Sequence, residues 1–218
     1  AVFSHLRFAA VNLQQSEHEM RERSLSVSAR FAARMIADKI DIRLRILEGI
    51  AEDRQLHELI APVDAQPRDK SLSEPLQRWL DAQRVRYEHI KDYAWAVFAS
   101  DGSQVARYPQ YQENGEPMVS LWQQYAYRDY FHGRLSDFET GPPIEHSHIS
   151  VAMESTNGGL IISFSTPIRA QADQPPMGVI TMSIELGQFA DLDISLPPGQ
   201  KVILVDSRRY FMKLAGSD

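Results

Sequence analysis

Proline and glycine are distributed unevenly along the 218-residue chain. All twelve prolines lie at or after Pro62, and Gly49 is the only one of the eleven glycines before residue 102. Because these residues disfavour helix interiors, the first sixty residues can form a long helix, whereas the last hundred contain many turns. This pattern excludes a repeat array, a collagen-like or low-complexity chain and a uniform doubly wound fold. It predicts a helical arm followed by a strand-rich module.

Composition and charge narrow the class of protein. The chain is 43% apolar and 24% charged, which is typical of one or two globular domains. Residues 1–60 carry nine basic and nine acidic residues, so the net charge of −6 arises entirely from the strand-rich module. An acidic module without a basic stripe does not favour nucleic acid as a partner, since phosphate neutralisation dominates that affinity.

Two absences in the sequence also matter. The chain has no cysteine, which excludes disulfides, thiolate metal sites and cysteine nucleophiles. It has no run of about 18 apolar residues that would span a membrane. Because it opens on Ala1-Val2-Phe3 without a methionine, we expect a fragment of a longer protein whose membrane-anchoring segments lie outside it.

Apolar residues from Phe31 onward follow a helical period on two faces. One stripe consists of Met35, Ile42, Ile46 and Ile50, and the other of Ile36, Ile40, Leu44 and Leu47. The charged residues share a third face: Arg30, Arg34, Asp38, Asp41, Arg45, Glu48 and Glu52. The pattern predicts an amphipathic helix from about residue 4 to residue 60, closed by Ala61-Pro62. We expect the second stripe to pack on a second helix or on the same helix of another copy in a homodimer.

Ser71 and Glu74 have the spacing of a capping box and predict that second helix, over about residues 71–91. From residue 93 the period changes to two. Strands are predicted at 93–100, 104–108, 146–154, 160–168, 177–184 and 201–206. Asp101-Gly102 joins the first two, a short aromatic-rich helical region covers 120–135, and a helical turn starts at Phe189. The order predicts an α+β fold in which a long N-terminal helix packs on a five- to six-stranded antiparallel PAS-like sheet with short covering helices.

Four motifs stand in a specific order along the module. They are Val97-Phe98-Ala99-Ser100-Asp101-Gly102, Tyr127-Arg128-Asp129-Tyr130-Phe131, Ile162-Ser163-Phe164-Ser165-Thr166-Pro167-Ile168 and Gly178-Val179-Ile180. With the long helix before them, residues 25–190 resemble the Cache family, the PAS-like extracellular sensor domains of bacterial chemoreceptors and sensor kinases. The resemblance implies a signalling helix at 1–60 and a sensor domain at 61–192. Residues 193–218 would be a final strand or the start of a truncated second module.

The resemblance also implies a ligand site between the sheet and the segments that cover it. Arg128 would anchor a carboxylate or other anion, and Tyr130 and Tyr125 would add hydroxyl groups and an aromatic wall. The amino-acid-binding branch of the family has an acidic residue after its G-V strand. Ser183 stands there in this chain, which favours a carboxylate ligand without an amine or another small polar ligand. Strand alternation points four further candidates at the same cavity, namely His148, Ser150, Ser165 and Ser183.

Each candidate also has a purely structural interpretation. Arg128 could form an ion pair with Asp129, Asp137 or Glu139, and the tyrosines could be core residues. His146 and His148 have the H-x-H spacing of zinc ligands, but no third ligand stands at a matching position, so no metal is expected. No motif supports a haem, a flavin or another cofactor. No nucleophile elbow, Walker loop or H-E-x-x-H sequence supports catalysis, so no catalytic residue is assigned.

The sequence therefore predicts the sensor domain of a membrane-anchored signalling receptor, located in the periplasm or outside the cell. It would bind a small carboxylate and transmit a shift of the sheet through the long helix. Two alternatives remain open: a ligand-free domain for dimerisation or protein interaction, and a soluble enzyme on a similar sheet.

Overall fold

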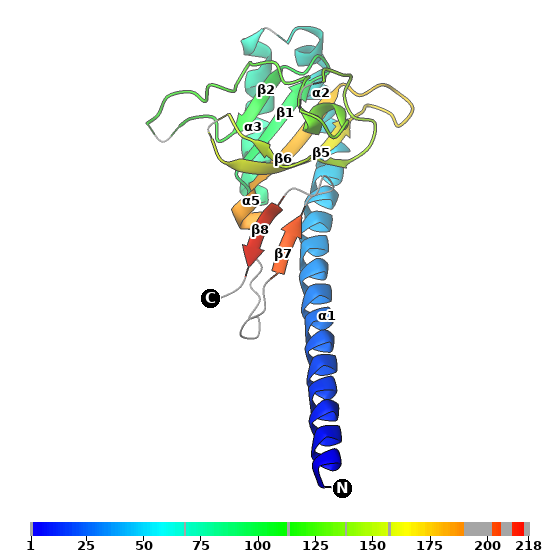
Figure 1. The fold of residues 1–218 in the computed structure, drawn as a ribbon. Helices are drawn as coiled ribbons and strands as arrows, with labels where there is room; N and C mark the ends of the chain where they lie inside the picture. The colour runs from blue at the N-terminus through cyan, green and yellow to red at the C-terminus, as the bar shows by residue number, and fades with distance from the viewer. Residues whose placement is uncertain are drawn as a thin grey trace.

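The computed structural model describes residues 2–67, 69–112, 114–137, 139–156, 158–189, 202–205 and 211–215, with side chains between residues 15 and 189. An antiparallel sheet forms the body of the molecule, and helix α1 (Val2–Ala51) extends far beyond it as a rod that ends at the N-terminus (Figure 1). The predicted α+β architecture is confirmed.

The predicted single helix over residues 4–60 is wrong at its end. The chain forms two helices there, α1 and α2 (Arg54–Ala65), and the Asp53 carboxylate accepts the Gln55 N–H at 2.9 Å to cap the second. An N-cap aspartate competes with helical backbone hydrogen bonding, so Asp53 ends one helix and begins the next despite the continuing apolar period. Pro62 does not close the helix but lies inside α2.

Helix α3 (Lys70–Arg86) follows, and its predicted boundaries also need correction. Its N-cap is Asp69, whose carboxylate accepts the Ser71 N–H at 3.0 Å, so the Ser71–Glu74 pair is not the capping box that its spacing suggested. The helix ends at Arg86, before the predicted residue 91. Helices α2 and α3 pack on each other, and α3 also packs on β2.

The main sheet has six strands in the order β2-β1-β6-β5-β3, with β4 pairing beside β3 on β5. The strands are β1 (Ala94–Ala99), β2 (Gln104–Tyr108), β3 (His148–Ile149), β4 (Met153–Glu154), β5 (Leu160–Ile168) and β6 (Gly178–Glu185). The Asp101-Gly102 turn joins β1 to β2 as predicted. Gly102 has φ +87°, a conformation that glycine adopts without strain, and its N–H donates to the Ala99 carbonyl at 2.9 Å.

Two predicted elements, the helical region at 120–135 and the strand at 146–154, are shorter than expected. Between residues 120 and 135 the only helix in the described chain is α4 (Asp129–His132), since Trp122 and Leu135 have positive φ angles of 71° and 57° that interrupt a helix. The strand predicted at 146–154 is divided into β3 and β4. Helix α5 (Leu186–Phe189) precedes the helical turn expected to start at Phe189, and residues 190–192 of that predicted turn lie outside the described residues.

The predicted last strand pairs outside the main sheet. β7 (Val202–Val205) and β8 (Phe211–Ala215) form an antiparallel pair of their own, and β8 lies near α5. The predicted end residues Lys201 and Asp206 lie outside the described residues.

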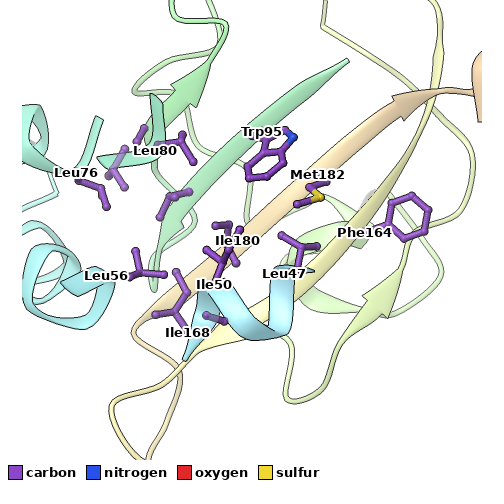
Figure 2. Close-up of a cluster of buried hydrophobic side chains, with 14 of the residues drawn as sticks. Leu47, Ile50, Leu56, Leu76, Leu80, Trp95, Phe164, Ile168, Ile180 and Met182 are labelled. Carbon is purple, nitrogen blue, oxygen red and sulfur yellow. The ribbon is translucent and has the colours of Figure 1, made fainter. Parts of the chain in front are cut away.

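The two faces of the main sheet are covered differently. On one face the helices α1, α2 and α3 bury a large apolar core, in which Trp95, Ile180 and Met182 from the strands meet Leu47 and Ile50 from α1 (Figure 2). Helix α1 packs on β5 and β6, and its second stripe (Ile36, Ile40, Leu44 and Leu47) belongs to this core. The stripe therefore packs mainly on the sheet. The charged face of α1 is exposed, as its solvated character predicts.

The opposite face carries a smaller cluster that includes Phe98, Tyr125, Tyr130, Phe131 and Ile144. The segment between β2 and β3, which contains α4, covers this face. The candidate site lies between this covering segment and the sheet.

Candidate ligand-binding site

Small side chains from the two central strands form the floor of a cavity under the covering segment. In the register of β1 and β6, Ala94 lies opposite Ser183 and Ala96 lies opposite Thr181, and all four line the cavity. Alanine, serine and threonine leave space above the strands that larger residues would fill. The cavity volume is about 50 Å³, which is room for a few water molecules, since one needs roughly 10–15 Å³ on this scale.

Aromatic side chains form one wall. The Phe98 ring lies 5.7 Å from the Tyr125 ring and 5.3 Å from the Tyr130 ring, measured between centroids. Burial raises the pKa of Tyr130 well above its usual value, and burial followed by Tyr127 raises the pKa of Tyr125. Both phenols are therefore neutral at physiological pH and can donate or accept hydrogen bonds.

Arg128, the predicted anchor, lines the cavity and is also engaged in an ion pair. One of its terminal nitrogens, Nη1, contacts the Asp137 carboxylate and donates to the Glu154 carbonyl at 3.1 Å. The structural interpretation is therefore correct for Asp137. The Nε–H of Arg128 is buried and has no hydrogen-bond partner within the described chain. Arg128 thus retains one donor that is not satisfied by the protein.

Several cavity residues escaped the sequence reasoning, and two polar ones among them come from β2. Arg107 is 5% exposed and Gln104 is 4% exposed, and both line the cavity. The Gln104 Oε1 atom is buried without a partner among the described residues. A lone arginine near the end of a strand is usually exposed to solvent, so the sequence does not predict Arg107 as a cavity residue. Its burial depends on the covering segment, through Ser120 and Tyr125, and strand periodicity carries no signal of that.

The remaining predicted residues divide between the cavity and its surroundings. Tyr125, Tyr130 and Ser183 line the cavity, whereas His148, Ser150 and Ser165 do not. His148 pairs with Ser165, and Ser165 pairs with Thr181, which lines the cavity. His148 and Ser165 therefore lie on the cavity face of the sheet, but α4 covers β5 at their position.

The three residues outside the cavity have other surroundings. His148 Nε2 contacts the Asp129 carboxylate of α4 at 3.2 Å. The Ser150 hydroxyl donates to the Val151 carbonyl at 2.9 Å and accepts the Ser163 N–H at 2.9 Å. The Ser165 hydroxyl is buried and has no partner among the described residues, away from the cavity lining. Alternation along a strand defines the face of a side chain but not what covers it.

Metal sites and membrane-spanning helices are the other features of interest in the described chain. Within the described residues, no group of three or more histidines, aspartates and glutamates is arranged to hold a metal ion. Among the same residues, no helix has the length and apolar character needed to cross a membrane.

No protein-family model matches the sequence, and no curated protein matches it either. Solved structures do match. The ligand-binding domain of the Campylobacter jejuni chemoreceptor Tlp3, in complex with L-valine, is 13% identical with a TM-score of 0.64 over 95% of this chain and 74% of that one. The sensor domain of the V. cholerae histidine kinase DctB is 16% identical with a TM-score of 0.57 over 82% of this chain.

This chain has the fold of these sensor domains. A third example is the ligand-binding domain of the Pseudomonas fluorescens chemoreceptor CtaA in complex with L-serine, 15% identical with a TM-score of 0.54 over 89% of this chain and 72% of that one. The resemblance drawn from the four sequence motifs is confirmed at the level of the fold. The chain spans only 61% of the length of the DctB sensor domain.

Proposed function

We propose that this chain is the ligand-sensing domain of a transmembrane signalling receptor and binds a small carboxylate in the cavity between the sheet and its covering segment. The observation that carries the proposal is the cavity lining, in which two guanidinium groups and two neutral tyrosines converge above a floor of small residues. The solved domains with this fold include complexes with L-valine and L-serine, which are carboxylates. Such a domain would lie in the periplasm or outside the cell.

The charge of the lining favours a ligand with a carboxylate and no amine. Arg107 and Arg128 face the cavity, whereas Glu154, the only acidic residue in the lining among the described residues, is exposed. Ser183, at the position where an amine-binding site would need an acid, donates to or accepts from Ser163 Oγ at 2.8 Å. A ligand ammonium group would thus lack a buried counter-charge. Arg128 would bind the carboxylate through its unpaired Nε–H, and Tyr130 and Tyr125 would orient it.

Signal output would pass through α1, which packs on the opposite face of the same strands. Polar contacts of α1 with residues of the sheet side hold the helix in this position. Arg43 of α1 pairs with the buried Asp92 just before β1 at 2.8 Å, and Glu48 accepts the Ser147 hydroxyl at 2.7 Å. Ser147 also hydrogen-bonds Thr166 of β5 at 3.1 Å. A ligand that favours one arrangement of the sheet would shift α1 relative to it.

A second function has one observation in its favour. Helix α1 exposes large apolar side chains along its projecting part, namely Met20, Leu25, Val27 and Phe31, and the cavity is small. The chain could then act as a dimerisation domain without a ligand. We propose that the chain forms a homodimer through α1, and this dimerisation does not exclude ligand sensing. An enzymatic role has no catalytic motif behind it.

The proposal is tested by thermal unfolding with acetate, propionate, lactate, succinate, L-valine, L-serine and γ-aminobutyrate, and with propionamide as a neutral isostere of propionate. At a ligand concentration of 100 times Kd, a bound carboxylate raises Tm by about 5–10 °C. No response to any carboxylate, together with concentration-dependent dimerisation, would favour the interaction domain. Turnover of a bound compound would favour the enzyme.

Two variants separate anchoring by Arg128 from its structural role. Arg128→Ala removes the guanidinium, and Asp137→Asn breaks the ion pair but keeps the guanidinium in the cavity. If Arg128 binds the ligand, Arg128→Ala loses the response and Asp137→Asn retains it. Loss of the response in both folded variants would show that Arg128 acts only through its ion pair.

A further inference from the structure

Arg107 is a buried cation whose partners are all neutral. Its Nε donates to the Pro109 carbonyl at 3.2 Å, one Nη contacts the Ser120 hydroxyl, and the Tyr93 hydroxyl also hydrogen-bonds the guanidinium. No described carboxylate lies within ion-pair distance of it. The arginines Arg43 and Arg128, which are also largely buried, each pair with an aspartate. Arg107 therefore differs from them in lacking a counter-charge within the described chain.

A cation in this environment is unfavourable unless an anion accompanies it. Removing a guanidinium from water costs free energy that neutral hydrogen-bond acceptors recover only in part. Burial lowers the pKa of Arg107, but an arginine side chain stays protonated at physiological pH. The charge is thus retained inside the protein next to a cavity, where an anion would gain most from it.

The geometry around Arg107 leaves space for such an anion. Arg107 pairs with Ala96 across the β1–β2 ladder, and Ala96 extends only a methyl group into the cavity. Arg107 and Arg128 line the same cavity as the Tyr125 and Tyr130 phenols, so the two guanidiniums border a shared space. The unpartnered Gln104 Oε1 lies in this lining as well.

We infer that Arg107 is the charge partner of the ligand and binds its carboxylate through the guanidinium fork, while Arg128 contributes a second hydrogen bond through Nε. Gln104 then accepts a hydrogen bond from a donor on the ligand, such as a hydroxyl. The inferred ligand class is a small carboxylate with a neighbouring hydroxyl group. This inference rests on the proposed ligand-sensing function and assigns its specificity to β2.

The test compares the wild-type protein with Arg107→Met, Arg107→Lys and the matched control Arg54→Met, which removes an exposed arginine on α2. Affinity for lactate, propionate and propionamide is measured by calorimetry, and folding is checked by thermal unfolding. We expect Arg107→Met to bind lactate at least about 30-fold more weakly, because a buried carboxylate would lose its charge partner. Arg107→Lys should fall between it and the wild type, and Arg54→Met should bind like the wild type.

Selectivity separates a binding role from a structural one. Loss of the charge partner should reduce the preference for propionate over propionamide to within about threefold, whereas a structural role would weaken both ligands equally. If Arg107→Met does not fold, the same comparison with Arg107→Gln decides, because glutamine removes the charge but keeps hydrogen-bonding groups. Folded Arg107→Met with unchanged lactate affinity and selectivity overturns the inference and leaves the proposed function intact. No binding of any tested carboxylate to the wild-type protein overturns the proposed function itself.

Discussion

Gln77 of α3 binds both backbone groups of Arg107. Its Oε1 accepts the Arg107 N–H at 2.9 Å, and its Nε2 donates to the Arg107 carbonyl at 2.8 Å. β2 is an edge strand of the main sheet, so the Gln77 amide occupies the hydrogen-bonding groups that another strand would otherwise use. Helix α3 thereby holds the residue whose side chain faces the cavity.

We expect Gln77→Leu to lower the free energy of unfolding by about 1–3 kcal/mol, because it leaves a buried N–H and carbonyl of β2 without partners. Urea unfolding followed by circular dichroism measures this. The matched control is Arg78→Ala on the exposed side of α3, where the ion pair with Glu74 spans 3.9 Å and should contribute less than about 0.5 kcal/mol. Equal effects of the two substitutions would contradict the importance of the Gln77 contact.

Ala96→Leu should block the cavity without unfolding the domain. The larger side chain would occupy the space between Arg107 and Thr181, so carboxylate affinity should fall at least about tenfold, while overpacking lowers stability by about 1–3 kcal/mol. Calorimetry and thermal unfolding measure the two effects. Ala82→Leu on the exposed face of α3 is the size-matched control. Normal binding by folded Ala96→Leu would place the ligand elsewhere.

The Asp129 carboxylate gives a prediction for the pH dependence of stability. It accepts the Leu135 N–H at 2.6 Å, the Val151 N–H at 2.8 Å and a contact from His148 Nε2 at 3.2 Å. Burial by itself raises the pKa of Asp129, but these hydrogen bonds outweigh it and hold the pKa below the usual 3.8. The folded state therefore favours the ionised form.

Asp129→Asn should accordingly destabilise the protein by about 1.5–3 kcal/mol at pH 7. The part of this difference that comes from ionisation is fully present above the unfolded-state pKa and is lost as the pH falls through the lower, folded-state pKa. Unfolding between pH 3 and pH 7 measures it, with the exposed Asp38→Asn as control. A gap between wild type and Asp129→Asn that widens toward pH 3 would contradict the assignment.

Homodimerisation through α1 is tested at Phe31, whose side chain is 53% exposed on the projecting part of the helix. A charge there would be buried in a helix–helix interface, so Phe31→Glu should weaken self-association at least about tenfold in analytical ultracentrifugation. Arg30→Glu, on the charged face, should self-associate as the wild type does. A monomeric wild-type protein at millimolar concentration would exclude this interface.

The sequence predicted most strands well but helix ends poorly, for a physical reason. The boundaries of β2 and β5 match the predicted strands because alternation and flanking turns are local signals. The junction between α1 and α2 and the start of α3 depend instead on single capping aspartates, Asp53 and Asp69.

The same difference applies to the candidate site. Arg128, Tyr125, Tyr130 and Ser183 were found because they belong to motifs or strand positions with a fixed relation to the sheet. Arg107 was missed because its burial depends on a covering segment that is distant in sequence and mostly irregular. His148, Ser150 and Ser165 were assigned to the cavity by alternation alone, which cannot anticipate that α4 lies over that end of the sheet.

In β1 and β6, neighbouring residues face opposite sides of the sheet. A residue that lines the cavity is therefore next in the chain to one that packs under α1. Thr181 lines the cavity, and its neighbour Met182 lies in the core beneath α1; Ala94 and Trp95 are related in the same way. The covalent separation between the cavity and the packing surface of α1 is therefore one peptide unit. A displacement of the backbone by a fraction of an ångström at either strand changes both surfaces at once, with no relay of intervening side chains.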